Sequence, residues 1–171
     1  MKLDINKIDF KSTTDNIKLI THDNVMLKFW SPKILAPFGI DKEYNKYLFK
    51  LEVDESILEI AYFKKLISYI ETLIKKKLNI DDNEFKSVIK NREKKDDIIE
   101  CRLKTMKNNM VTEVEYEDKD TYYLKTIYDI PKQSYVKAQI EINGIWDYRT
   151  ENKDNNKCGL IVNIKKIIVL K

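Results

Sequence analysis

The segment Ile142-Asn143-Gly144-Ile145-Trp146-Asp147-Tyr148-Arg149 ends a run of alternating apolar and polar residues that starts at Ser134. A period of two is typical of a β-strand with one buried face. Gly144 interrupts the alternation, which predicts a β-bulge at this point. A bulge would turn Ile145 inward and Trp146 and Tyr148 outward, beside Arg149. Without a bulge, both aromatic residues would point into the core.

Further strands are predicted on both sides of this segment. The alternating stretches are residues 25–30, 46–54, 98–104, 110–117 paired with 121–128, and 158–170. Pro32 and Pro37 predict a loop over residues 31–43, because proline lacks the amide hydrogen that a central strand needs.

One long helix is predicted over residues 56–78, where apolar residues recur at helical spacing. Ser56 and Glu59 fit a capping box at its start. Asp81 or Asp82 is predicted to cap a second, short helix that carries Phe85, Val88 and Ile89.

This order of elements does not alternate strand and helix, which argues against a doubly wound parallel sheet. It predicts an α+β domain that is mainly β. The expected form is a five-stranded antiparallel Greek-key barrel of the OB type, with one long packed helix and a short second helix. Residues 1–24 are expected to be an N-terminal arm or edge strand, and residues 25–171 a single OB-like nucleic-acid-binding domain.

Composition fits one folded domain of 171 residues, with 43% hydrophobic and 35% charged residues. The 32 basic and 28 acidic residues leave a net charge of +4, which permits a polyanionic partner without requiring one. The two cysteines, Cys101 and Cys158, have no partner at metal-ligand spacing and are expected to be buried thiols. With no apolar leader segment or membrane span, the expected location is a reducing compartment, the cytoplasm or nucleus of the host, and not the exterior.

Signatures of enzymes are missing. The single histidine, His22, lies in a polar turn, and no cysteine–histidine dyad or metal cage has recognisable spacing. No glycine-rich loop could cradle a phosphate. We therefore expect no catalytic residue, no metal, no cofactor and no enzymatic activity.

Aromatic and basic residues suggest a different chemistry. A protein that holds single strands needs cations along the phosphates and flat rings against the bases. Trp30 shares a strand face with Lys28, and Trp146 and Tyr148 precede Arg149. The candidate nucleic-acid-binding residues are Lys28, Trp30, Lys33, Phe38, Lys50, Arg102, Lys104, Trp146, Tyr148 and Arg149.

Most of the basic strand positions also have an acidic neighbour two residues away or opposite. A surface on which salt bridges neutralise these basic residues is therefore an equal alternative to a nucleic-acid-binding surface. Convergence of Lys28, Arg102, Lys104 and Arg149 beside an exposed Trp146 would favour strand binding. Neutralisation of every basic residue would favour a structural role.

Three stretches resemble the single-stranded-DNA-binding proteins of large eukaryotic (nucleocytoplasmic) DNA viruses. They are Ser31-Pro32-Lys33-Ile34-Leu35-Ala36-Pro37-Phe38-Gly39-Ile40, residues 46–52, and residues 138–148 leading into 159–168. Residues 85–89, followed by residues 101–104, resemble the same family less closely. The resemblance implies an oligonucleotide-binding barrel that coats unwound DNA during viral replication, without catalysis or strong sequence preference. It also implies that residues 37–39 and Trp146 flank the strand path and that Arg102 and Lys104 meet phosphates.

The expected function is therefore a single-stranded-DNA-binding coat protein. The alternatives are a viral structural or protein-interaction module that binds no nucleic acid, and an RNA-binding OB-fold protein, because nothing in the sequence reads a 2′-hydroxyl. The expected partners are single-stranded DNA, or RNA as the alternative, further copies of the chain and other replication proteins, and no membrane.

Overall fold

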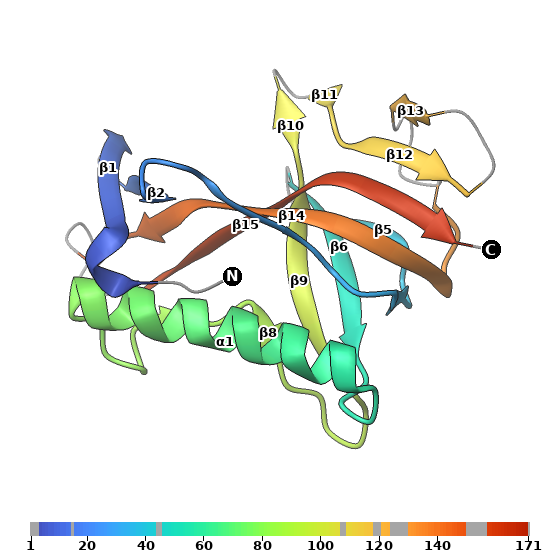
Figure 1. Ribbon diagram of the computed structural model, residues 1–171, viewed down its shortest axis with the longest axis horizontal. Helices are drawn as coiled ribbons and strands as arrows, with labels where there is room; N and C mark the ends of the chain where they lie inside the picture. The colour runs from blue at the N-terminus through green and yellow to red at the C-terminus, as the bar shows by residue number, and fades with distance from the viewer. Residues whose placement is uncertain are drawn as a thin grey trace.

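The computed structural model describes residues 4–14, 16–43, 46–106, 109–117, 121–123, 130–149 and 157–170. Two long antiparallel strands cross the whole molecule, β14 (Ser134–Asp147) and β15 (Cys158–Leu170) (Figure 1). Their alternating apolar residues form the centre of the hydrophobic core, as the sequence predicts. The helix α1 (Leu58–Leu78) lies beneath these strands in the same view.

Chain segments from the first third of the protein pair with the free edge of β14. They are β2 (Ile17–His22), β3 (Leu27–Trp30) and β4 (Ile34–Ala36), and β1 (Ile8–Thr14) pairs with β2. A short 3-10 helix, η1 (Ile5–Lys7), precedes β1.

The other edge of β15 receives short parallel pairings. Its partners are β7 (Phe85–Lys86), β9 (Asp97–Leu103) and β12 (Glu113–Tyr116). β9 continues the sheet through β6 (Lys46–Val53) to β5 (Ile40–Glu43), and β8 (Ile89–Lys90) also pairs with β9. The hairpin β12–β13 (Thr121–Tyr123) and the pair β10 (Thr105–Met106)–β11 (Asn109–Met110) lie at the periphery.

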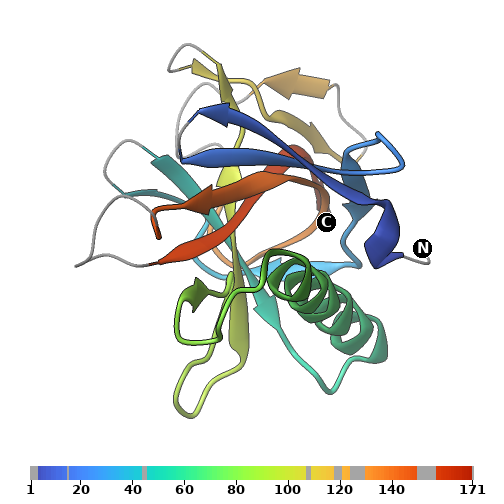
Figure 2. The same cartoon turned by 90° about the vertical axis from the view of Figure 1, so that its left-hand side faces the viewer.

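The prediction of an α+β fold that is mainly β is confirmed, but the prediction of a closed five-stranded antiparallel barrel is wrong. The sheet follows the order β1-β2-β14-β15-β9-β6-β5, so it has more than five strands. Its end strands β1 and β5 do not pair with each other among the described residues, which leaves the sheet open. The pairings of β15 with β7, β9 and β12 are parallel, unlike those of an antiparallel barrel. The view in Figure 2 shows α1 below β14 and β15.

The bulge at Gly144 is confirmed, since the register between β14 and β15 shifts between Ile142 and Gly144. Beyond the shift Ile145 is fully buried, whereas Trp146 is half-buried and Tyr148 is exposed. Glycine is needed here because a Cβ atom at this position would overlap the backbone oxygen of Lys18 on β2. The bulge therefore sets the orientation of both aromatic side chains.

The long helix is confirmed over Leu58–Leu78, but its predicted capping box is wrong. Ile57 occupies the N-cap position without a side-chain cap, and Ser56 instead donates its hydroxyl and amide hydrogens to Asp54. At the other end Asn79 adopts a left-handed conformation (φ 50°), which closes the last turn behind a run of lysines.

The predicted second helix is wrong, since residues 85–90 form β7 and β8 instead. The buried carboxylate of Glu71 on α1 holds the turn between these strands. It accepts hydrogen bonds from the Ser87 hydroxyl (2.8 Å) and the Val88 amide (2.8 Å). Burial raises the pKa of Glu71, which these hydrogen bonds partly offset. Tertiary contacts thus override a local preference for helix.

The loop predicted for residues 31–43 contains two short strands, β4 and β5. Pro32 and Pro37 lie on either side of β4 and interrupt no ladder, so their missing amide hydrogens are tolerated. The hairpin predicted from residues 110–117 and 121–128 is present as β12 and β13, and residues 124–128 lie outside the described residues.

Candidate nucleic-acid interface

Trp146 lies flat over a glycine. It is the cross-strand partner of Gly159, and a Cβ atom added at Gly159 would approach the Cζ2 atom of Trp146 to 2.8 Å. The ring also contacts Tyr148, with centroids 5.8 Å apart, and the Lys86 ammonium lies 6.0 Å from its centroid. These contacts hold the indole in one place while leaving part of it accessible.

We expect Gly159→Ala to displace this ring. The added methyl group would also approach the Lys86 backbone oxygen to 2.8 Å, so a shift is unavoidable. Overpacking of this kind costs about 1–3 kcal/mol of folding stability. The measurement is thermal unfolding together with tryptophan fluorescence, excited selectively, in a Trp30→Phe background where Trp146 is the only tryptophan. An unchanged emission spectrum and melting temperature would contradict the close packing of Trp146 against Gly159.

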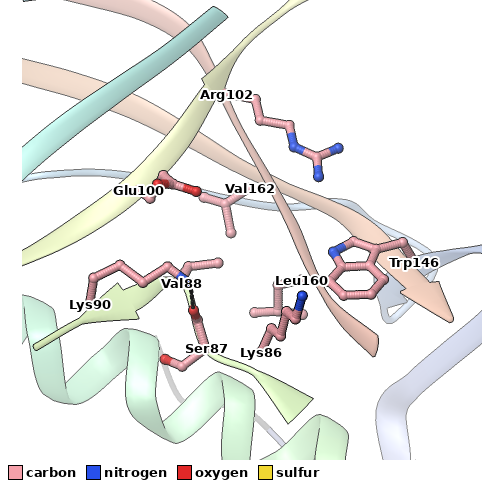
Figure 3. Close-up of a pocket in the computed structure, with 9 residues that line it drawn as sticks. All are labelled: Lys86, Ser87, Val88, Lys90, Glu100, Arg102, Trp146, Leu160 and Val162. Atoms are coloured by element: carbon pink, nitrogen blue, oxygen red, sulfur yellow. Dashed lines mark hydrogen bonds between the residues drawn. The ribbon is translucent and has the colours of Figure 1, made fainter. Parts of the chain in front are cut away.

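A hollow opens beside Trp146, where β9 and β15 diverge (Figure 3). β15 pairs with β7 through Cys158 and Gly159 and with β9 through Asn163 and Ile164. The intervening β15 residues have no strand partner on that edge among the described residues. The hollow has a volume of about 140 Å³ and is lined by Lys86, Ser87, Val88, Lys90, Glu100, Arg102, Trp146, Leu160 and Val162.

Cations dominate the rim of this hollow, which we call the Trp146 groove. Arg102 reaches from β9 toward the indole, as Figure 3 shows. Lys86 lies over the ring, and Lys90 donates to the Ser87 carbonyl oxygen at 2.6 Å. No ion pair is recorded for Lys86, Lys90 or Arg102 among the described residues. The groove therefore carries three cations without a direct ion pair among the described residues, together with one carboxylate, that of Glu100.

Two neighbouring cations have lowered pKa values, for different reasons. Burial lowers the pKa of Arg102, partly opposed by the nearby Glu100 and Tyr148. The positive charge of Arg102 lowers the pKa of Lys46, and burial adds to that effect. Both shifts mean that the charged forms are less favourable here than in water. A bound anion would relieve that penalty.

A row of outer-face residues connects the groove to the opposite edge of β14. Cross-strand pairing places Lys28 opposite Glu141, Glu141 opposite Asn163, and Asn163 opposite Arg102. Such partners share one face of a sheet. Glu141, which is almost fully buried, binds Lys28 at 3.0 Å and Lys104 at 3.3 Å. Burial alone would raise the pKa of Glu141, but hydrogen bonds from both lysines outweigh it, and the net shift is downward.

Arg149 is engaged inside the protein. Its guanidinium makes a two-pronged contact with Asp147 at 2.9 and 3.0 Å and lies 3.5 Å from Glu84. Hydrogen bonds from Arg149 hold the pKa of Asp147 at about 2, and Asp147 in turn raises the pKa of Arg149. Lys18 on β2 also binds Asp147, at 3.2 Å. This cluster fixes the end of β14 immediately after Trp146.

Phe38 forms a second exposed aromatic position. Lys50 and Arg92 both lie 5.9 Å from its ring centroid. Lys50 also pairs with Asp41 at 3.2 Å and Glu43 at 3.3 Å, and these contacts outweigh burial to raise its pKa. Lys50 is the cross-strand partner of Glu100, so the Phe38 position and the Trp146 groove share one face of β6 and β9.

Trp30 and Lys33 lie at the other end of β14. Trp30 is 42% exposed and pairs with Gln139, on the same face as Lys28. Lys33 lies 5.2 Å above the ring of Tyr135, which is 49% exposed. Gln139, the partner of Trp30, lies seven β14 positions from Trp146, roughly 23 Å along the strand, and Tyr135 lies farther still.

The expected convergence of four basic residues on Trp146 is therefore incomplete. Arg102 lies beside the indole, whereas Lys28 and Lys104 share Glu141 and Arg149 binds Asp147. Neutralisation of every basic residue does not occur either. The sequence-based set missed Lys86, Lys90 and Tyr135. Lys86 lies within the segment predicted to form a second helix and Lys90 directly follows it, whereas Tyr135 follows a proline break without a recognisable motif.

A larger cleft between η1 and α1 has less suitable chemistry for an anionic polymer. It is lined by Asp4, Ile5, Lys7, His22, Asp23, Tyr69 and Leu73. Lys7 pairs with Asp23 at 3.0 Å, and the His22 Nε2 atom accepts from the Asp4 amide at 3.1 Å. Its polar groups are thus satisfied by one another.

Other functional classes find little support in the described part of the chain. No group of histidine, cysteine, aspartate and glutamate side chains there could hold a metal ion. Cys101 and Cys158 are buried and free, and burial raises their thiol pKa values to about 12 and about 11. The described helices include none with the length and apolar character to cross a bilayer.

Comparison with known proteins identifies the fold but no family. No protein-family model and no curated protein sequence matches this chain. Among solved structures, the single-stranded DNA-binding protein of bacteriophage Enc34, C-terminally truncated, is similar with a TM-score of 0.55 and 18% identity. The match covers 97% of this chain and 94% of that chain.

A second similar structure is that of gp2.5, a single-stranded DNA-binding protein encoded by bacteriophage T7. Its TM-score is 0.53 at 9% identity, over 86% of this chain and 87% of that chain. At such identities the likeness establishes a shared fold and leaves activity to be argued from the site. Both structures are of phage proteins, so they do not support the eukaryotic-virus origin that the sequence resemblance implied.

Proposed function

We propose that this protein binds single-stranded DNA without catalysis and coats it during replication of a viral genome. The observation behind this proposal is the Trp146 groove, where an accessible indole lies beside Lys86 and Arg102, two cations without an ion pair among the described residues. A ring for stacking and cations for phosphates are the two requirements for holding an unpaired strand. The fold shared with phage proteins named for this activity adds support.

The strand path that fits these positions runs over the outer face of β9 and β6. It starts at Tyr148 and Trp146, passes Arg102 and reaches Lys50 and Phe38. Cross-strand pairing supports this continuity, since Arg102 faces Leu48 and Glu100 faces Lys50. Trp30 and Lys33 would extend the contact across β14. Lys28 and Lys104 lie beside this path but are paired with Glu141, and Arg149 would position the end of β14.

We also propose a domain organisation, a cellular compartment and partners for this protein. Residues 25–171 would act as one nucleic-acid-binding domain with residues 1–24 as an arm or edge, in a reducing compartment inside the cell. Self-association along the strand and contacts with other replication proteins would accompany coating. RNA is the alternative ligand, because stacking and phosphate contacts do not distinguish the two sugars.

The deciding experiment is an anisotropy titration with oligo(dT), oligo(U) and a duplex at two salt concentrations. We expect oligo(dT) to bind at least tenfold more tightly than duplex. With Lys46, Lys86 and Arg102 on phosphates, log K should fall with log salt at a slope of about −2, at about −0.7 per contact. Equal binding of duplex, or affinity independent of salt, would contradict the proposal. Equal binding of oligo(U) would establish a general single-strand binder.

A protein-interaction module is the second candidate. Leu58, Tyr62 and Tyr69 on α1 are 64%, 61% and 48% exposed, and large exposed apolar groups on one helix face are typical of contact surfaces. This candidate predicts no binding to any of the three nucleic acids, so the same titration separates the two functions.

A further inference from the structure

Glu100 is an unexpected residue in a groove suited to a polyanion. It projects from β9 into the Trp146 groove, two residues before Arg102 and on the same strand face. Its backbone amide donates to the Val88 oxygen at 2.9 Å, but no hydrogen bond or ion pair of its carboxylate is recorded among the described residues. A carboxylate repels phosphate, so its place in the groove needs another explanation.

The surfaces around Glu100 suit a flat ring. The apolar lining of the groove comes from Val88, Leu160 and Val162, which are 8%, 3% and 2% exposed. Trp146 forms one wall, and Figure 3 shows Arg102 above it and Lys86 below. At about 140 Å³ the space is well below the 300–1,000 Å³ typical of closed small-molecule sites. Its small size favours one ring over a larger ligand.

Charge is distributed so that the two parts of a nucleotide would find different partners. Arg102 and Lys86 lie at the rim, where a phosphate can stay hydrated. Glu100 lies about 6.6 Å from Arg102 along β9, at two residues of strand rise. A carboxylate accepts hydrogen bonds only, so it pairs with the amino group of cytosine or adenine. Thymine has no amino group, and its single donor, the N3–H, lies between two carbonyl oxygens that a carboxylate repels.

We propose that the Trp146 groove is a base pocket in which Glu100 accepts a hydrogen bond from an exocyclic amino group. This inference rests on the single-strand binding proposed above. The pocket favours amino-bearing bases over thymine at one position of an otherwise sequence-tolerant strand path. Glu100 is thus a specificity-determining residue rather than a phosphate contact.

The test compares oligo(dC) and oligo(dT) of equal length on the wild-type protein and on Glu100→Gln. Removing a negative charge should tighten binding of both oligonucleotides. The ratio of oligo(dC) affinity to oligo(dT) affinity should nevertheless fall by about fivefold, because glutamine can also donate to thymine carbonyls. The matched control is Glu141→Gln, which neutralises a carboxylate on the same face outside the groove and should leave the ratio unchanged.

A second measurement needs no variant. Replacing cytosine in the oligonucleotide by 2-pyrimidinone, which lacks the 4-amino group, should weaken binding to the wild-type protein by about fivefold. If both oligonucleotides bind but neither substitution changes their relative affinities, the base pocket is wrong and strand binding stands. If the wild-type protein binds neither oligonucleotide, the proposed function itself fails and the base pocket fails with it.

Discussion

Replacing Trp146 with alanine is expected to weaken oligo(dT) binding by about fivefold to 150-fold, which corresponds to about 1–3 kcal/mol for one stacked base. The indole is the largest ring in the groove, and Gly159 and Lys86 hold it in place before any ligand arrives. Its removal therefore takes away a preformed platform. The measurement is anisotropy with labelled oligo(dT) at low salt.

Two variants control this experiment. Trp146→Phe keeps a flat ring and should retain most of the affinity, whereas a loss equal to that of alanine would argue against stacking. Trp30→Ala removes the other tryptophan, which is 42% exposed and lies roughly 23 Å away along β14. If only Trp30→Ala weakened binding, the strand path would lie at the other end of the sheet. Unchanged melting temperatures would separate lost binding from lost folding.

Replacing Glu141 with glutamine is expected to tighten single-strand binding by about tenfold at low salt. Glu141 holds Lys28 at 3.0 Å and Lys104 at 3.3 Å, in the row that continues to Arg102. Neutralising it would free both ammonium groups for phosphates. Two added contacts should steepen the slope of log K against log salt by about 1.4, at about 0.7 each. The measurement is the oligo(dT) affinity at several salt concentrations.

This variant is expected to lose about 1–3 kcal/mol of folding stability, because Glu141 is almost fully buried and loses the charge-assisted hydrogen bonds that it accepts from both lysines. Lys28 and Lys104 are themselves 38% and 39% exposed, so water can solvate their freed ammonium groups. Adding Lys28→Ala and Lys104→Ala to Glu141→Gln should abolish the gain. If Glu141→Gln alone left both affinity and salt slope unchanged, Lys28 and Lys104 would lie off the strand path.

Local sequence patterns were sufficient to predict the structure of segments whose geometry depends on their own residues. Gly144 predicted the bulge, and the bulge turned Ile145 inward and Trp146 and Tyr148 outward. Alternation predicted the buried face of β6, and helical spacing predicted α1. Local patterns failed at residues 85–90, where pairing with β15 and β9 and the Glu71 contacts replaced a helix by strands.

The candidate site shows the same division in its charges. The sequence places each basic residue on the polar face of a strand, but it does not show which acidic residue forms a salt bridge with it. Arg149 lies near Asp147 in the chain, but the carboxylate that holds Lys28 and Lys104 comes from Glu141, more than thirty positions away from either. Which cations stay free is therefore a property of strand order.

By itself, the amino-acid sequence determined the longer strands β6, β9, β14 and β15, the long helix and the outward turn of the aromatic residues, because periodicity and a bulge-forming glycine act over a few residues. Tertiary structure alone decided that the sheet stays open and that β9 and β15 diverge. It also decided that Lys86, Glu100, Arg102 and Trp146 meet in one groove. The physical reason is that the register between distant strands, and hence the pairing of their charges, depends on how the whole core packs.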